Sequence, residues 1–287
     1  MSWFAEISKG SDIVRIGGDG TVAGAALNAR SLKGWWSTPS EKVSMTERES
    51  GDGAHDVEPE AVLYSARTVT LEVEAGGRNR LEVQESMEAL LRMAHGIVAL
   101  RVVDGLSDTY CMGFLSTEVR AAKATNGYED VTVTVRCPNP ERLSSVRRRG
   151  FLNPSREGFG GLVYDSGVLA FPLSYGAGAG SVRSVCTVEN RGTSTAYPLI
   201  SASGYMPQGF VLTDVATGDQ LEYSQAVGVS PVVIDCRSRT ASVLAVDVTR
   251  NVTRRSFPTV GPGGTLTLSL SASGTGTVEV SVRDTYV

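Results

Sequence analysis

Two histidines are the side chains best suited to act as a general base near neutral pH, and a hydrolase would have to use one of them. His55 lies beside Asp52 and Asp56, a setting that either binds a metal ion or, as is more common, is a solvated loop. His95 follows an amphipathic segment, where an imidazolium interacts favourably with the C-terminal dipole of a helix. Neither histidine indicates a catalytic site.

Motifs for nucleotide, acyl-transfer or zinc chemistry are missing from the sequence. It contains no G-x-S-x-G elbow, P-loop or H-E-x-x-H, and the glycine-rich stretches 17–20 and 176–180 lack the spacing of a dinucleotide loop. Glu72 and Glu74 are two residues apart on a predicted strand and share a face, whereas glycosidase carboxylates face each other across a cleft. We therefore predict that the protein is not an enzyme and has no catalytic, cofactor-binding or metal-binding residues.

Four cysteines lie far apart in the sequence, at Cys111, Cys137, Cys186 and Cys236. None forms the C-x-x-C pair that zinc or redox sites use. Each occurs in an apolar, strand-like run, and a disulfide framework is typical of smaller secreted chains. We predict four buried, reduced thiols.

The charge and hydropathy of the chain exclude two classes of function. A net charge of −4 with a pI of about 5.4 argues against a protein that binds nucleic acid by neutralising many phosphates. No segment has the ~18 consecutive apolar residues of a membrane span, and the first residues lack a basic region followed by an apolar stretch. We expect synthesis in the cytoplasm, no membrane insertion and no sequence-specific contact with nucleic acid.

Period-two alternation dominates the sequence and predicts half-buried antiparallel strands, as in 68–74, 131–135 and 265–270. Thirty-two glycines punctuate the chain at intervals that suit short strands and turns. The exception is 81–94, where apolar residues follow helical spacing and Gly96 offers a C-terminal stop. The sequence predicts a mainly β protein with one helix.

Composition divides the 287 residues into three parts. The first, residues 1–144, holds the helix with strands at 97–103, 110–119 and 129–136, and closes near the prolines of 137–140. Residues 145–180 combine an arginine run with many glycines, which favours a connector that is a solvated linker or a subunit contact. Residues 181–287 contain seven or eight predicted strands, typical of a β-sandwich or jelly roll. Those strands are 185–189, 199–203, 210–215, 232–236, 241–248, 265–272 and 277–282.

Several segments carry a family resemblance that covers most of the chain. They are a strand leading into the helix (64–71), a proline-containing segment (137–140), a glycine-then-proline stretch (160–164 with 171–173), an N-x-G followed by A-x-P (189–198), an aspartate and turn (233–240), and a penultimate turn (260–263). Their order resembles the distal tail protein family of siphophages, the long-tailed phages with non-contractile tails.

This resemblance implies a tail-tube-like β-sandwich or barrel with one α-helix, followed by a galectin-like or jelly-roll sandwich that faces outward. It implies a homo-oligomer, typically a hexameric ring around the DNA channel at the distal end of the virion tail. The partners it implies are the tail tube protein, the hub or tip protein, and also the tape measure and receptor-binding proteins.

The segment 41–60 holds seven acidic residues against two basic ones, a local charge of about −5, and predicts a long mobile loop. In a ring, this loop would either border the channel or contact a neighbouring ring. We favour the inter-ring contact, because two tryptophans before the loop offer an apolar anchor; an equally good interpretation places them in the core, followed by a disordered loop. The residues of the predicted contact are Trp35, Trp36, Glu47, Glu49, Asp52 and Asp56.

Two other functions compete with the structural one. The second half could be a carbohydrate-binding β-sandwich, although residues 182–287 contain no tryptophan and few aromatic residues to stack on sugars. A jelly-roll glycoside hydrolase is the other alternative, and activity on cell-wall polysaccharide would distinguish it.

Overall fold

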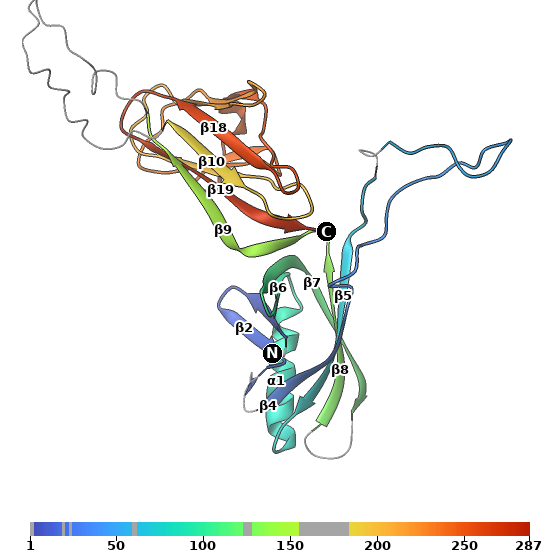
Figure 1. Cartoon of the computed structure of the whole chain (residues 1–287). Coiled ribbons are helices and arrows are strands. Elements are labelled where there is room, and N and C mark those ends of the chain that lie inside the picture. The colour runs from blue at the N-terminus through green and yellow to red at the C-terminus, as the bar shows by residue number, and fades with distance from the viewer. Residues whose placement is uncertain (1–2, 19–20, 23–24, 59–61, 123–127, 155–183) are drawn as a thin grey trace, which may run out of the picture. The chain divides into compact units, whose positions relative to one another are not determined.

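The structure is a computed structural model that describes residues 3–18, 21–22, 25–58, 62–122, 128–154 and 184–287 (Figure 1). Its contacts divide the chain into two units, Met1–Ser145 with Tyr286–Val287, and Val146–Thr285. Each unit has its own cluster of buried apolar side chains. The predicted mainly β fold with one α-helix is confirmed for the described residues.

Unit 1 is built on antiparallel strands. One run of pairing follows the order β3-β4-β5-β8-β7, and from β7 a second run continues through β6 and β1 to β2. On β5 every second residue is buried, so Val69, Leu71, Val73 and Ala75 all face the core. The strands are β1 (Phe4–Lys9), β2 (Asp12–Ile16), β3 (Thr21–Val22), β4 (Ala25–Lys33), β5 (Arg67–Gly76), β6 (Ile97–Asp104), β7 (Ser107–Ala122) and β8 (Tyr128–Cys137).

The helix α1 (Arg80–Met93) packs one face against this core, as its spacing predicts. Its buried face consists of Val83, Ser86, Met87, Leu90 and Met93. The helix begins at Asn79, whose side chain accepts a hydrogen bond from Glu82 N, and the Glu82 carboxylate accepts one from Arg78 N in return. At the other end Gly96 has a φ of +121°, which turns the chain into β6.

Unit 2 contains two sheets whose inner faces share one core, which agrees with the predicted sandwich. Its first sheet has the order β16-β15-β14-β11-β19-β9 and its second the order β10-β18-β12-β13-β17. The strands are β9 (Arg142–Leu152), β10 (Val185–Glu189), β11 (Leu199–Ser203), β12 (Phe210–Asp214), β13 (Gln220–Tyr223), β14 (Val232–Asp235), β15 (Thr240–Val243), β16 (Val246–Asp247), β17 (Val252–Arg255), β18 (Thr265–Ser271) and β19 (Thr277–Tyr286).

Strand β9 differs from the sequence prediction, because it occupies residues that we assigned to a connector. Arg148 on β9 makes a bidentate ion pair with Asp284 on β19, and Leu152 is fully buried in the core of unit 2. The arginine run is therefore part of a sheet rather than a solvated linker. The rest of the predicted connector, 155–180, including its glycine-then-proline stretch, lies outside the described residues.

One predicted strand of unit 2 is divided. Residues 241–248 form β15 and β16 of a hairpin, because Leu244 and Ala245 both have positive φ and turn the chain back on itself. A strand continuing through 241–248 is incompatible with this turn.

Candidate functional site

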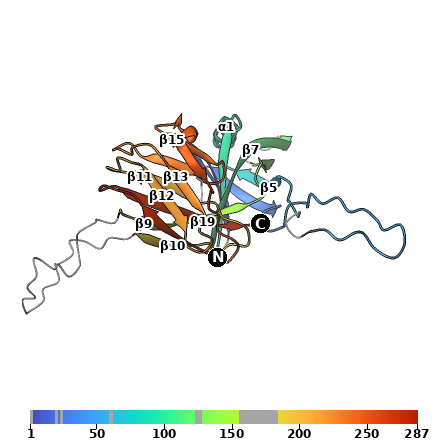
Figure 2. The ribbon, with the colours of Figure 1, turned by 90° about the horizontal axis from the view of Figure 1, so that it is seen from above.

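The connection between β4 and β5 is the feature of unit 1 that extends farthest from its sheet (Figure 1, Figure 2). These two strands are paired neighbours, yet 33 residues separate Lys33 from Arg67. Within this connection, residues 38–58 and 62–65 form an extended ribbon that we call the arm. Its two sides run antiparallel and meet at the bridges Glu41–Tyr64 and Glu47–Ala54.

Backbone hydrogen bonds join the two sides of the arm in its described residues. Near its origin Ser65 N donates to Ser40 O over 2.8 Å and Lys42 N to Leu63 O over 2.6 Å. Toward its tip, His55 N donates to Thr46 O over 2.9 Å. Pairing of this kind leaves side chains on both faces of the ribbon in solvent.

Arg67 fixes the segment from which the arm leaves the sheet. It occupies an inward position on β5 and is 1% exposed. Its guanidinium donates to four backbone carbonyls, those of Gly34 at 2.7 Å, Trp35 at 3.1 Å, Ser37 at 2.9 Å and Pro140 at 2.7 Å. Burial lowers the pKa of Arg67 from its ordinary value. These bonds satisfy carbonyls that no strand partner reaches.

Gly34 is required at this exit. Its φ is +80°, and a Cβ at this position would lie 2.0 Å from Thr68 O, well inside contact distance. The residue after β4 therefore has to be glycine for the chain to turn toward the arm.

The two tryptophans of the predicted contact lie at the base of the arm and have different environments. Trp35 is completely buried in the core of unit 1, whereas Trp36 is 51% exposed. The guanidinium of Arg142 lies over both rings, 5.6 Å from the centre of Trp35 and 5.3 Å from that of Trp36. The interpretation of Trp35 as an interface anchor is wrong for this structure, and Trp36 is the ring that a partner can reach.

The four acidic residues of the predicted contact gather on the outer part of the arm. Glu47, Glu49 and Asp52 are exposed, and the fully exposed side chain of Asp56 pairs with Arg48 at 3.4 Å. They lie beyond the Glu41–Tyr64 bridge, whereas the tryptophans precede it in the chain. The predicted contact is therefore two separate features, an aromatic base and an acidic tip.

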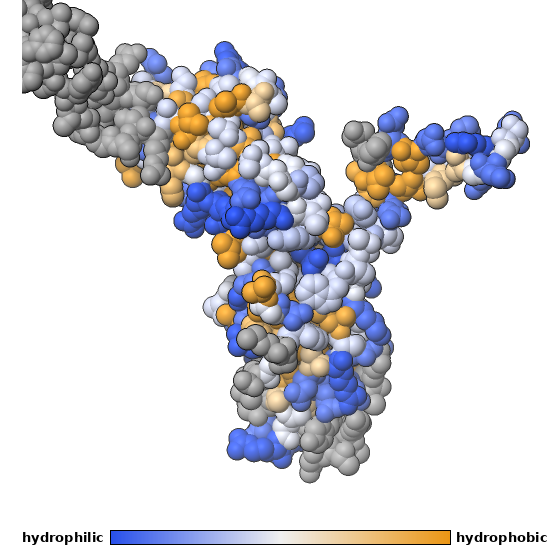
Figure 3. Space-filling model, in the orientation of Figure 1, coloured by the Kyte–Doolittle hydropathy of each residue, from blue (hydrophilic) through white to orange (hydrophobic). Residues whose placement is uncertain are grey.

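Apolar side chains are also exposed along the arm. Met45 is 71% and Leu63 61% exposed, with Val62 beside Leu63. Figure 3 shows hydrophobic atoms gathered on the part of the arm between its origin and its tip. An extended ribbon cannot bury such side chains within its own chain, so they are suited to contact another protein.

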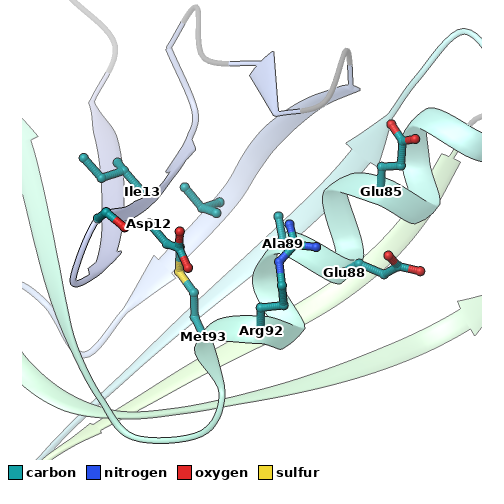
Figure 4. Close-up of a pocket in the computed structure, with 9 residues that line it drawn as sticks. Asp12, Ile13, Glu85, Glu88, Ala89, Arg92 and Met93 are labelled. Atoms are coloured by element: carbon teal, nitrogen blue, oxygen red, sulfur yellow. The ribbon is translucent and has the colours of Figure 1, made fainter.

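A groove of about 590 Å³ lies between the turn after β1 and the helix (Figure 4). Asp12 and Ile13 lie on the hairpin side, and Glu85, Glu88 and Arg92 lie on the helix side. Its lining contains Ser11 and the carboxylates of Asp12, Glu85 and Glu88, and neither histidine nor cysteine.

The side chains that we considered for chemistry do not converge. His55 lies on the arm, whereas His95 follows α1 and its carbonyl accepts a hydrogen bond from Lys9 Nζ. Glu72 and Glu74 pair with Lys33 and Arg30 on β4, as structural carboxylates do. Among the described residues, no group of three or more histidine, cysteine, aspartate or glutamate side chains could hold a metal ion.

Sequence reasoning missed both Arg67 and Arg142. A signal for Arg67 does exist, because period-two alternation with Val69, Leu71 and Val73 places it on the inward face of its strand. Arg142 gives no such signal, since its position over the tryptophans depends on the pairing of β9 with β7.

Within the described residues, no helix is long and apolar enough to cross a membrane.

Comparisons with known proteins find likeness in structure alone. No family model matches the sequence, and no curated protein matches it. The Dit protein of phage SPP1, described as a paradigm of the hub adsorption apparatus of phages infecting Gram-positive bacteria, is similar with a TM-score of 0.58 and 13% identity, over 91% of this chain and 94% of that one. A chain of the phage P2 baseplate in its activated conformation with Ca has a TM-score of 0.55 and 10% identity, over 99% and 98%. The Sr form of that baseplate gives 0.54 and 10%, with 98% of each chain covered.

Proposed function

We propose that this protein is a structural, non-enzymatic component of a bacteriophage tail tip, the distal tail protein of a long non-contractile tail. The observation that carries the proposal is that the likeness to SPP1 Dit extends over 91% of this chain and 94% of that one. Both units and their order along the chain therefore take part in it. Likeness of fold alone does not establish function. The exposed side chains of the arm are a second, independent observation in support of the proposal.

In this proposal, unit 1 assembles into a ring, hexameric by expectation, around the channel through which DNA passes. The arm supports assembly, because Trp36, Met45 and Leu63 are exposed apolar side chains that a neighbouring subunit can cover. The ring joins the tail tube protein to the hub protein, near the tape measure, and unit 2 carries receptor-binding proteins. The acidic tip of the arm contacts the neighbouring ring of the tail.

Purified full-length protein tests this proposal by negative-stain imaging together with light scattering after size exclusion. We expect rings with a central hole and a mass corresponding to six chains. Release of sugars from cell-wall polysaccharide is assayed on the same sample. A monomer at every concentration would contradict the proposal, and a monomer that releases sugars would establish the glycoside hydrolase instead.

A further inference from the structure

Two of the four cysteines, distant in the sequence, are brought together in the core of unit 1. Cys111 on β7 and Cys137 at the end of β8 have their sulfur atoms 3.0 Å apart. Both are free thiols, and they are 2% and 1% exposed. Their burial agrees with the prediction of four buried thiols, as does that of Cys236, whereas Cys186 is only partly buried.

The strand register explains why the sulfurs meet. Phe114 lies opposite Arg136, so Gly113 lies opposite Cys137, and Cys111 follows two residues along on the same face. Gly113 provides the space, because a Cβ there would lie 2.9 Å from Cys137 Sγ. Without that Cβ, the Cys137 side chain can lean along the sheet toward Cys111.

The surroundings of the pair favour a thiolate at Cys137. The hydrogen bond between the two sulfurs and the charge of Arg67, opposite Cys137 in the sheet, outweigh burial and hold the pKa of Cys137 below its ordinary value. The same pairing, together with burial, raises the pKa of Cys111. The charge of Arg67 acts on both sulfurs, whereas that of Arg142 acts on Cys111. Of the two thiols, Cys137 is therefore the one that loses its proton more readily.

We propose that Cys111 and Cys137 form a buried redox pair, which a small peroxide converts into a disulfide that links β7 to β8. The Cys137 thiolate attacks one oxygen of hydrogen peroxide, which breaks the O–O bond, forms a sulfenic acid and releases hydroxide. The sulfur of Cys111 then displaces that hydroxyl, and its proton leaves with it as water. Overall, two thiols are oxidised and one peroxide is reduced to two waters.

This site does not depend on the proposed function, because it concerns the fold of unit 1 in any assembly state. Oxidation of the pair would place a covalent link beside the segment where Arg67 holds the base of the arm. A link closing the 26-residue separation restricts the unfolded chain, so oxidised unit 1 unfolds at a higher temperature.

The test treats the reduced full-length protein with hydrogen peroxide and then alkylates the remaining thiols after denaturation. We expect peptide mass spectrometry to find Cys111 joined to Cys137, lighter by two hydrogen atoms, in a form that dithiothreitol reverses. Cys186 and Cys236 should remain reduced, and so be alkylated, because burial raises the pKa of their thiols to about 11 and about 12 and keeps them protonated during the peroxide treatment. The unfolding temperature should rise by roughly 5 °C on oxidation.

Variants separate the roles of the two sulfurs. In Cys111→Ser, Cys137 has no partner and should accumulate a sulfenic acid that dimedone labels, whereas Cys137→Ser should show no labelling. Cys236→Ser is the matched control, and it should form the link as the wild type does. Full alkylation of both cysteines in the peroxide-treated wild type would overturn the proposal, whether or not the variants fold. So would a link that leaves the unfolding temperature unchanged.

Discussion

At the scale of single residues, the base of the arm depends on one buried cation. Arg67 uses its planar set of donors to reach four carbonyls from two segments of the chain, which a lysine ammonium on a flexible stem cannot reproduce. Arg142 then covers the tryptophan rings that follow Gly34. An inward arginine thus replaces the strand pairing that is missing where the chain leaves β4.

We predict that Arg67→Met lowers the free energy of unfolding by about 3 kcal/mol or more, because buried carbonyls lose their donors. Chemical denaturation of the full chain, followed by tryptophan fluorescence from Trp35, measures this loss. The matched control is Arg78→Ala, which removes an exposed arginine paired with Glu82 and should change stability by no more than about 0.5 kcal/mol. Equal stability of the two variants would contradict the role of Arg67.

Asp284 makes unit 2 sensitive to acid. Burial alone would raise its pKa, but hydrogen bonds from Arg148 and from Arg191 N outweigh burial and hold the pKa below its ordinary value. A depressed folded-state pKa contributes stability above the unfolded-state pKa of about 3.9, and this contribution is lost as the pH falls through the folded-state value.

We therefore predict that Asp284→Asn destabilises unit 2 at pH 6 and that the difference from the wild type shrinks toward about pH 2. Urea unfolding at a series of pH values measures this difference. Asp219→Asn, a change at an exposed carboxylate of the same unit, is the control and should not show the same trend. A constant difference between Asp284→Asn and the wild type at all pH values would refute the assignment.

At the scale of elements, regular patterns predicted the structure and irregular ones did not. The helix was predictable because its apolar spacing, Asn79 cap and Gly96 all agree. Strands β1 to β4 give weaker signals, since β1 buries only Ala5 and Ile7 and β2 only Val14 and Ile16. Their pairing to β6 and β5 stabilises them, and sequence does not show such partners.

The candidate site was predictable in part, for a related reason. Exposure of Glu47, Glu49, Asp52 and Asp56 follows from their charge alone. The difference between Trp35 and Trp36 does not follow from composition, because both lie in a bend after β4, where no strand periodicity indicates which of them enters the core.

The acidic tip of the arm gives a prediction about attachment. Replacing Glu47, Glu49, Asp52 and Asp56 together with their amides should leave ring formation intact and weaken attachment to tail tubes, because the contact would lose its charge complementarity. Attachment of wild-type rings should fall as salt rises, and that of the variant should depend less on salt. Co-sedimentation with purified tubes across a salt series measures both.

Glu85→Gln with Glu88→Gln is the control for this experiment, since both carboxylates are exposed on the helix rather than on the arm. It should attach as the wild type does. If the arm variant attaches normally at every salt concentration, the acidic tip does not form the contact.

At the scale of the whole molecule, the sequence suggested two domains, and the contacts divide the chain into two units. The chain passes from one to the other within β9, not in a glycine-rich linker. Composition misled here because the arginines of β9 are paired within the sheet, as in Arg148 with Asp284 and Arg149 with Glu279. Composition cannot distinguish an arginine run whose side chains form cross-strand ion pairs from an arginine run exposed in a linker.

A fragment starting at Val146 keeps Leu152 in the core and Arg148 beside Asp284, so residues 146–285 should fold alone as a cooperative monomer. A fragment starting at Ser181, the boundary that composition indicates, loses both and exposes the edge of β19. We expect it to be less stable by about 3 kcal/mol or more, because a core side chain is missing and a mostly buried carboxylate has lost its cation. Urea unfolding of the two fragments measures the difference.

Leu152→Ala in the longer fragment should reproduce part of the loss, whereas Arg147→Ala, at an exposed position of the same strand, should not. Equal stability of the two fragments would place the boundary of the unit after β9.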